Sequence, residues 1–290
     1  MLDAKVRYPP TGSANCHTFD SGMLLEKVQN ASIAMLRTAT AAMRFRRPDV
    51  GACCTDLAGA CVAYSGPDVP LTCAVGVGTS SAVQATDIAA IEDFYESRKS
   101  PVRIAISGRT KDGVNSLLAS RGYQAGTPME NWWRPLADIP AKPVPDTIQV
   151  QPATLDDADV WVRTVAAGFQ ESNAPVDEST VPTGLLDTFY CFGFADGAQP
   201  FMVRRNGEAA GGGVLHINGD AAYLRTTSCR FVHRRNGVHT ALLNVRLQWA
   251  LRAGCRFAFS STVGIGASAR NLERIGLVPL SISFLMSKAS

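Results

Sequence analysis

Two stretches of the chain show helical and extended hydrophobic patterns in alternation, which predicts a mixed α/β protein. In the first stretch, apolar residues at helical spacing predict helices and short apolar runs predict strands. The predicted elements are a helix over 22–44, paired strands within 50–64, a strand over 71–77, a helix over 86–98, a strand over 102–106, a helix over 111–121 and a strand over 131–135. The polar, proline-rich segment 137–146 then indicates a linker.

The second stretch repeats this alternation after the linker. Its predicted elements are a strand over 149–152, a helix over 155–168, a hairpin of 201–205 and 210–217, a strand over 221–232, a helix over 240–253, a strand over 256–262, a helix over 268–277 and a strand over 280–286. Asn206-Gly207 is a favoured hairpin turn. Capping side chains are predicted at Thr154, at Ser268, and at either Thr86 or Asp87.

The most informative segment is the basic turn RRNGVHTALL at residues 234–243, between the predicted strand over 221–232 and the helix that follows it. The first N–H groups of a helix lack partners inside the helix, and the helix dipole adds partial positive charge there. Gly237 permits close approach of a ligand to the backbone. Arg234 and Arg235 add full charges. The turn is therefore a candidate diphosphate site.

This turn resembles the acyl-CoA pyrophosphate loop of the GNAT superfamily of N-acetyltransferases, Arg/Gln-x-x-Gly-x-Gly/Ala. Arg234 and Gly237 match its first two anchors, and His239 stands at the third. The surrounding order of elements, the triple glycine at 211–213 and the segment ARNLERIGLVPL are also similar to this family. The resemblance extends from residue 147 to 290 and implies a GNAT acetyltransferase domain there.

The first half carries a weaker echo of the same pattern. LLASRGY at 117–123 is analogous to NLERIGL at 271–277, since each ends a helix with a glycine and an apolar residue. The corresponding turn, GVGTSSAVQAT, has no Arg or Lys. We therefore expect tandem GNAT-like domains, a degenerate one over 1–140 and the acetyl-CoA-binding one over 147–290. The alternative to tandem domains is that the similarity of these two segments is one that any α/β domain can show.

Composition narrows the functional classes. The net charge of +3 over 290 residues does not favour nucleic acid as a partner. No apolar run approaches a membrane span, and the N-terminus lacks a signal-peptide pattern, so a cytoplasmic protein is expected. The eight cysteines are expected to be reduced thiols. No C-x-x-C occurs and no histidine pair has ligand spacing, so no metal site is predicted.

The resemblance to the GNAT family implies acetyl-CoA as cofactor and assigns the residues that would hold it. The pyrophosphate turn comprises Arg234, Arg235, Asn236, Gly237, Val238, His239 and Thr240. Backbone groups of Cys229, Phe231 and Val232 would bind the pantetheine arm and polarise the thioester carbonyl, and Asn271 is a further contact.

The catalytic acid and base are less defined by the resemblance. Many GNAT enzymes protonate the departing thiolate with a tyrosine four residues before the glycine that follows the last helix, but Leu272 occupies that position. Tyr223 is the candidate acid, with water as the alternative. Glu171 and His216 are candidate bases. Tyr223 and His216 also have a structural alternative, as a core tyrosine and as a neutral, hydrogen-bonded histidine of a strand.

These features predict an acetyl-CoA-dependent N-acetyltransferase that acts on the amine of a small molecule by direct attack in a ternary complex. A non-catalytic CoA-binding sensor or scaffold is one alternative. Acyl transfer to a protein or aminoacyl-tRNA amine is another. The sequence leaves the oligomeric state open, including a homodimer.

Overall fold

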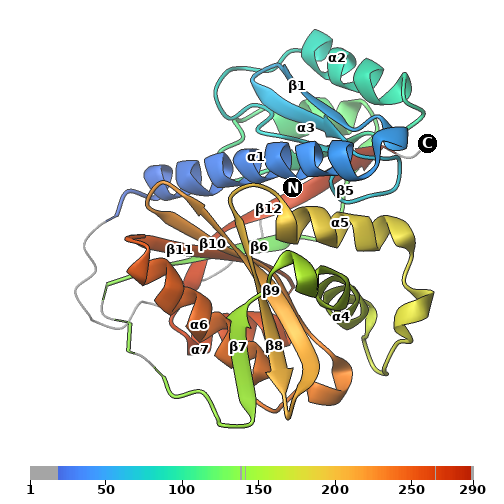
Figure 1. Cartoon of the computed structure of the whole chain (residues 1–290). Coiled ribbons are helices and arrows are strands. Elements are labelled where there is room, and N and C mark those ends of the chain that lie inside the picture. The colour runs from blue at the N-terminus through green and yellow to red at the C-terminus, as the bar shows by residue number, and fades with distance from the viewer. Residues whose placement is uncertain (1–18, 138, 141, 265, 289–290) are drawn as a thin grey trace.

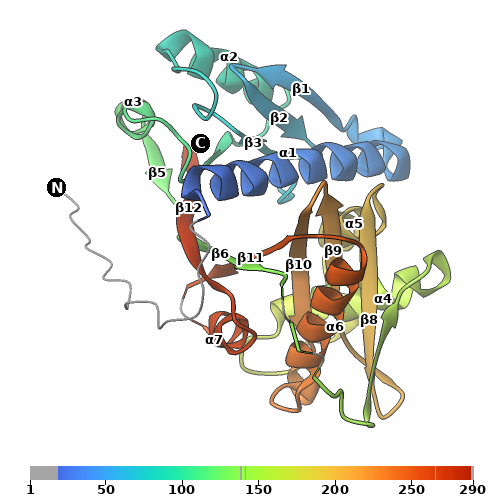
Figure 2. The same cartoon turned by 90° about the vertical axis from the view of Figure 1, so that its left-hand side faces the viewer.

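A computed structural model describes residues 19–137, 139–140, 142–264 and 266–288. Within them, twelve strands form one mixed sheet, and seven α-helices pack on it (Figures 1 and 2). The fold class is therefore mixed α/β, as the alternating patterns predicted. The helices are α1 (Ser21–Arg46), α2 (Ala85–Glu96), α3 (Val114–Ser120), α4 (Ala158–Gln170), α5 (Thr183–Phe194), α6 (Val238–Arg252) and α7 (Ala267–Arg274).

The sheet runs in the order β1-β2-β3-β4-β12-β6-β11-β10-β9-β8-β7, with β5 paired to β12. Its strands are β1 (Cys53–Leu57), β2 (Ala60–Tyr64), β3 (Cys73–Val75), β4 (Arg103–Ile106), β5 (Tyr123–Ala125), β6 (Met129–Pro135), β7 (Ile148–Pro152), β8 (Ala198–Arg205), β9 (Glu208–Asn218), β10 (Ala221–Cys229), β11 (Phe257–Val263) and β12 (Val278–Lys288).

Each half of the chain contains the same local arrangement. In the first half, β2 and β3 are antiparallel, and α2 connects β3 to the parallel strand β4. In the second half, β9 and β10 are antiparallel, and α6 connects β10 to the parallel strand β11. Parallel neighbours need such a crossover connection. These are the two parallel pairs of strands in the described sheet.

The two halves exchange strands where they meet. Strand β6, from the first half, lies between β11 and β12 of the second half and is antiparallel to both. Strand β12 continues past this pairing and completes the first half by pairing with β4 and β5. The indole Nε1 of Trp132 on β6 donates to Thr262 Oγ1 on β11 at 3.0 Å. Neither half therefore has a complete sheet by itself.

Helix α1 lies across the junction and contacts both halves (Figure 2). Its Leu24 and Val28 pack with Tyr223 and Phe259 of the second half, whereas Leu36 and Met43 pack with strands of the first half. Helices α4 and α6 cover opposite faces of β9 and β10. Helix packing on both faces therefore supports β9 and β10.

The triple glycine at 211–213 on β9 makes three close approaches. A Cβ on Gly211 would lie 2.3 Å from Ser228 O, and one on Gly212 would lie 2.6 Å from Trp161 Nε1. A Cβ on Gly213 would lie 2.7 Å from Arg246 Nη1. Because these three positions have no side chains, β10, α4 and α6 can all approach β9 closely.

Several predicted boundaries need correction. Helix α2 begins after Gln84, and the Asp87 carboxylate accepts from Gln84 N at 2.8 Å, so Asp87 acts inside the first turn and not as the N-cap. Gly266, not Ser268, is the N-cap residue of α7. Thr154 forms a capping box with Asp157, as predicted. Strand β10 ends at Cys229, and a 3₁₀ turn over Phe231–His233 follows it.

Helix α5 was not predicted from the sequence. Its residues TGLLDTFYCFGF are apolar on nearly every side, so they show little helical periodicity. The helix is apolar all round because it is packed between α1, α4 and β8.

The cysteines of the described residues are free thiols, and those other than Cys54 are buried or half-buried. Cys16 lies outside the described residues. None of the described helices is long and apolar enough to span a bilayer.

Candidate active site

Strands β10 and β11 separate at the centre of the second half. Their parallel pairing ends at Leu224 and Ser260, although each strand continues beyond that point. The pairing of β10 with β9 shifts register between Arg225 and Ser228, and Thr226 has a φ of 52°. A bulge of this kind bends a strand and leaves backbone groups unpaired. The separated strands therefore offer backbone N–H and C=O groups to a ligand.

A cavity of about 1290 Å³ occupies this separation and extends to the start of α6. Its walls come from the C-terminal end of α4, the end of β10, the first turn of α6, the end of β11 and α7. Thr226 and Thr227 of β10 and Ser261 and Thr262 of β11 line it. The volume exceeds the range of about 300–1,000 Å³ for small-molecule pockets, which suits an extended ligand.

The predicted phosphate turn forms one end of this cavity. Gly237 is the N-cap residue of α6 with a φ of 82°, and Arg235 before it has a φ of 62°. The first backbone hydrogen bond of the helix runs from Ala241 N to Gly237 O. The N–H groups of residues 238–240 therefore point out of the helix end, where Val238, His239 and Thr240 line the cavity.

The charge of the cavity is of one sign. Arg234, Arg235, Arg270 and Arg274 line it, and no Asp or Glu is among its described lining residues. Arg235 is exposed and lies on the turn itself. Arg270 and Arg274 stand four residues apart on α7, and neither was assigned from the sequence. Together with the helix N-terminus, these groups suit a polyanionic ligand.

Asn271 and His239 meet at this end of the cavity. The Asn271 Oδ1 accepts from Arg274 Nη1 at 2.8 Å, which turns Asn271 Nδ2 toward His239 Nδ1 at 3.2 Å. His239 Nδ1 is therefore the acceptor and its Nε2 carries the proton. Burial and the nearby Arg246 charge lower the pKa of His239 to about 4, so the ring is neutral at neutral pH. His239 thus provides shape and a hydrogen bond, without adding charge.

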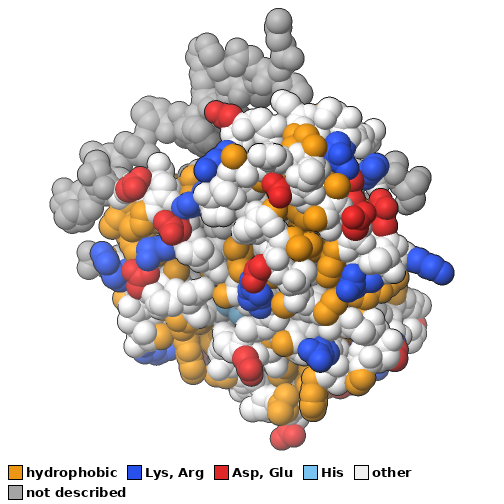
Figure 3. Space-filling view, turned by 90° about the horizontal axis from the view of Figure 1, so that it is seen from above, with side chains coloured by type: hydrophobic (Ala, Val, Ile, Leu, Met, Phe, Trp, Pro, Cys, Tyr) orange, Lys and Arg blue, Asp and Glu red, His pale blue; other side chains and the backbone are white. Residues whose placement is uncertain are grey.

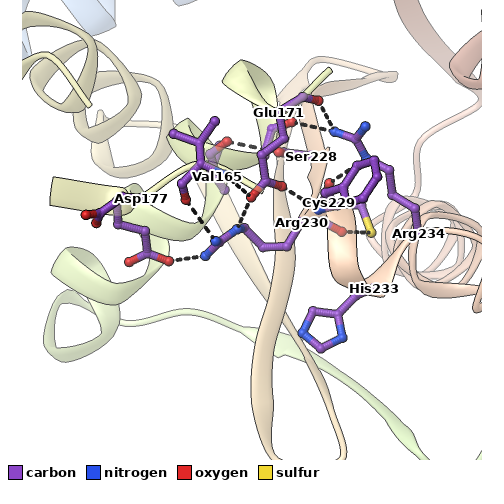
Figure 4. A network of polar contacts seen from close by, with 12 residues as sticks. Val165, Glu171, Asp177, Ser228, Cys229, Arg230, His233 and Arg234 are labelled. Atoms are coloured by element: carbon purple, nitrogen blue, oxygen red, sulfur yellow. Dashed lines mark hydrogen bonds and ion pairs between the residues drawn. The ribbon is translucent and has the colours of Figure 1, made fainter. Parts of the chain in front are cut away.

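Arg234 lies against the cavity, but its guanidinium group is engaged by the protein. Nε donates to Cys229 O at 3.2 Å, Nη1 to Ser172 O at 3.1 Å and Nη2 to Gly168 O at 3.1 Å and to Glu171 O (Figure 4). The carbonyls of Gly168, Glu171 and Ser172 lie at the C-terminal end of α4, where a cation is favoured by the helix dipole. Arg234 therefore fastens the turn to α4.

The Glu171 carboxylate is buried beneath the same loop. It accepts from Arg230 Nε at 2.9 Å, from Val176 N at 3.2 Å and from Phe231 N (Figure 4). The side chain is 1% exposed and does not line the cavity. Both oxygens are thus occupied, and the Phe231 N–H that was expected to face the ligand is bound to Glu171. The geometry gives Glu171 a positioning role in place of the predicted base.

We expect Glu171→Gln to lower the free energy of unfolding by about 2 kcal/mol, because hydrogen bonds to a charged group are lost around Arg230. Urea unfolding measures this change. Glu208→Gln is the matched control, since the Glu208 side chain is 77% exposed and its loss should change the unfolding free energy by under about 0.5 kcal/mol. Equal urea midpoints for the two variants would contradict the assignment.

Arg246 on α6 is fully buried and shapes the bulge in β10. Its Nη1 donates to Val214 O at 2.9 Å and to Arg225 O at 3.0 Å, and its Nη2 donates to Thr227 Oγ1 at 2.7 Å. Burial lowers its pKa to about 9, so it keeps its charge at neutral pH. The sequence held a signal for it, because Arg246 stands four residues from both Leu242 and Ala250 on the apolar stripe of α6.

Tyr223 lies beside the separated strands on the side opposite α6. Its hydroxyl lies 2.7 Å from Ser261 Oγ, and Ser261 Oγ donates to Asn131 Oδ1 at 2.8 Å. A serine has one proton to donate, so Tyr223 is the donor to Ser261. Ser261 lines the large cavity, whereas Tyr223 and Asn131 line a second one. The Tyr223–Ser261 pair therefore stands at the junction of two cavities.

His216 is opposite Tyr223 in the β9–β10 register but lines neither cavity. The residue is 7% exposed, and its Nε2 is buried without a hydrogen-bond partner. Burial, reinforced by the charge of Arg225, lowers its pKa to about 4. This position fits the alternative weighed for His216, a neutral core histidine, better than the role of a base.

The depressed pKa of His216 gives a pH dependence of stability. At neutral pH the ring is unprotonated in both states. As the pH falls below about 6.5, His216 becomes protonated in the unfolded chain. In the folded chain it becomes protonated only near pH 4. Stability should therefore fall across this window, and His216→Gln should weaken that fall. Urea midpoints at several pH values test it. An unchanged slope in the variant would contradict the assignment. His239 contributes in the same direction, so some slope remains.

The other predicted contacts divide between the cavity and its surroundings. Cys229 and Gly237 line the cavity with the residues already described. Val232 is 59% exposed and does not line it, and Asn236 Nδ2 donates to Arg234 O inside the turn. His233, which also lines the cavity, is 6% exposed. No group of three His, Cys, Asp or Glu that could hold a metal ion occurs among the residues that the structure describes.

Comparisons with known proteins agree with this arrangement. Residues 167–275 match the model of the acetyltransferase (GNAT) family. A GCN5-related N-acetyltransferase from Kribbella flavida shares the fold, with a TM-score of 0.63, 12% identity and coverage of 87% of this chain and 96% of that one. No curated protein shows significant sequence similarity to the chain.

Two further solved structures have a similar fold. A functionally unknown conserved protein from Staphylococcus epidermidis ATCC 12228 has a TM-score of 0.58 and 10% identity, covering 83% of this chain and 96% of that one. A tandem GNAT protein from the clavulanic acid biosynthesis pathway has a TM-score of 0.56 and 16% identity, covering 79% and 77%.

The fold is the mixed α/β architecture shared with these solved structures. The match over 167–275 shows that the second half of the chain carries a domain of the GNAT acetyltransferase family.

Proposed function

We propose that the protein is an acetyl-CoA-dependent N-acetyltransferase that acts on the amine of a small molecule by direct attack in a ternary complex. The observation that supports this most is the cavity between β10 and β11, which ends at the start of α6 with four arginines and no acidic residue among its described lining residues. The proposed domains remain 1–140 and 147–290, with β6 and β12 exchanged between them.

The residues of the cavity fit the parts of acetyl-CoA. The N–H groups of 238–240, with Arg235, Arg270 and Arg274, would hold the phosphates. The unpaired backbone after Leu224 would hold the pantetheine arm. When bound, the cofactor supplies an acyl group activated as a thioester.

In the proposed reaction, Tyr223 acts as the acid. The new bond joins the amine nitrogen to the acyl carbon, and the carbon–sulfur bond breaks with its electron pair on sulfur. The Tyr223 hydroxyl gives its proton to that sulfur and recovers one from the nitrogen, so the protons balance. Ser261, hydrogen bonded to Tyr223 and to Asn131, keeps the phenol in place. Leu272 is buried at 1% exposure and takes no part in proton transfer.

Calorimetry with CoA, followed by thiol release from acetyl-CoA in the presence of a panel of amines, tests this function. Binding of CoA together with steady turnover of an amine is expected. The absence of CoA binding would reject the proposal. Binding without any turnover would favour a non-catalytic sensor or scaffold, to which the missing tyrosine at Leu272 lends support.

Transfer to a macromolecule is the other alternative. On the face seen from above in Figure 1, basic and acidic side chains are interspersed over the described residues, not gathered by sign (Figure 3). Nucleic-acid partners favour a basic surface, so this face does not suit tRNA. A gel shift with tRNA, or acetylation of a peptide N-terminus in preference to small amines, would favour transfer to a macromolecule.

A further inference from the structure

A second cavity, of about 490 Å³, lies between the two halves on the other side of the Tyr223–Ser261 pair. Helix α1, strands β3 and β4, and the exchanged strands β6 and β12 supply most of its walls. Its size is within the range of small-molecule pockets. Only the assembled pair of halves forms it.

The walls of this cavity are largely apolar. Leu25, Val28, Leu36, Leu71, Phe192 and Phe284 are among the side chains that line it. Such a lining recognises an aliphatic or aromatic group, because burial of apolar surface in the pocket is favourable. A highly charged, sugar-like or polyamine acceptor would leave its polar groups without partners here.

Arg225 brings a cation into this apolar cavity. Its guanidinium carbon lies 4.9 Å from the centre of the Tyr223 ring, and its Nη1 lies 2.7 Å from Met35 Sδ, a weak acceptor. None of the carboxylates in the described part of the chain pairs with it. The acidic residue of the lining, Asp68, is exposed at the rim and lies 3.9 Å from Arg103. An arginine in this setting suits a carboxylate from a ligand.

Gln29 on α1 adds an independent sign of a ligand. The residue is 6% exposed and lines the cavity. Its Oε1 accepts from Ser107 Oγ at 3.0 Å, which fixes the amide, but its Nε2 is buried without a partner. A buried donor without an acceptor costs free energy, and an acceptor atom on a bound molecule would remove that cost.

We propose that this second cavity is the acceptor site and that it takes an apolar α-amino acid, whose carboxylate binds Arg225 and Gln29. This inference rests on the proposed acetyltransferase function. A carboxylate held beside the Tyr223 ring places the α-amine, two bonds away, at the junction with the first cavity. The amine gains an acyl–nitrogen bond as the carbon–sulfur bond breaks, giving an N-acetylated amino acid and the free thiol.

The test compares pairs of amines that differ only in the carboxylate. We expect kcat/KM to be at least tenfold higher for L-phenylalanine than for 2-phenylethylamine, and for L-leucine than for 3-methylbutylamine. Arg225→Met should remove this preference by lowering turnover of the amino acids alone, and Gln29→Leu should reduce it. Arg163→Met is the control, since Arg163 pairs with Asp159 on the exposed side of α4.

Calorimetry separates failure of this inference from failure of the proposed function. If CoA binds and both members of each pair are acetylated equally, the carboxylate site is wrong and the acetyltransferase stands. If CoA does not bind, the proposed function itself fails. In a protein that binds CoA without turnover, N-acetyl-L-phenylalanine is titrated instead. Its binding must be lost in Arg225→Met, and absence of binding to the unaltered protein would overturn the acceptor site.

Discussion

Replacing Gly237 with aspartate is expected to weaken CoA binding at least 100-fold. A Cβ at Gly237 would meet only Ile148 Cδ1, at 3.6 Å, so a side chain has room on this turn, and Gly237 itself lines the cavity. Its negative charge would stand where the N–H groups of 238–240 and Arg235 meet the diphosphate. Loss of two charge-assisted hydrogen bonds at about 1.5–3 kcal/mol each accounts for a change of this size.

Gly254 provides a matched control for this substitution. It follows the other end of the same helix, has the same φ of 82°, and has nothing within 4 Å of an added Cβ. Gly254→Asp therefore carries the same charge and the same left-handed strain of about 1–2 kcal/mol. It should lose more stability than Gly237→Asp, because a carboxylate is unfavourable at the C-terminal end of a helix, while CoA affinity stays within about threefold. Calorimetry gives the affinities and urea unfolding the stabilities. Similar losses of affinity in both variants would remove the turn from the site.

Removing the Tyr223 hydroxyl is expected to lower kcat about 100-fold, the lower end of what a general acid contributes. Tyr223→Phe deletes the proton proposed for the departing sulfur and keeps the ring that packs with Leu24 and Phe259. Loss of the hydrogen bond to Ser261 should cost about 1 kcal/mol of stability. The affinity for CoA should be unchanged, so the effect belongs to kcat.

Tyr95 offers the same chemical change away from the site. It is fully buried on α2, and its hydroxyl donates to Ala63 O at 3.1 Å. Tyr95→Phe should lower stability by a similar amount and leave kcat within about twofold. Steady-state kinetics with a saturating amine compares the two. A Tyr223→Phe enzyme with full kcat would show that water protonates the thiolate, which is the alternative left by Leu272.

Most elements were predictable because their signals are local. Helix α1, the hairpin at Asn206-Gly207 and the strand, turn and helix around Gly237 each depend on residues that are neighbours in the sequence. Helix α5 was missed because its neighbours bury it on nearly every side, which removes the periodicity that identifies a surface helix. The strand over 131–135 was predicted, but its partners β11 and β12 follow more than 100 residues later.

The location of the site could be predicted from the sequence, but the role of each side chain in it could be predicted less well. The turn at 234–240 lies at the end of a cavity, as a phosphate loop requires. The sequence does not show which hydrogen-bond partner each side chain has in the folded protein. Arg234 donates hydrogen bonds to carbonyls at the end of α4, and the Glu171 carboxylate accepts from Arg230 beneath the loop. The buried Arg246 guanidinium has room only because residue 213, which is far from it in the chain, is a glycine.

The exchange of β6 and β12 also bears on how the protein is made. While a ribosome is still adding residues beyond β6, the first half has strand β4 without the neighbour that β12 will provide, and its sheet stays open at that edge. An open edge invites pairing with other chains. Until β12 is made, the first half therefore has an unpaired strand edge that can pair with other chains.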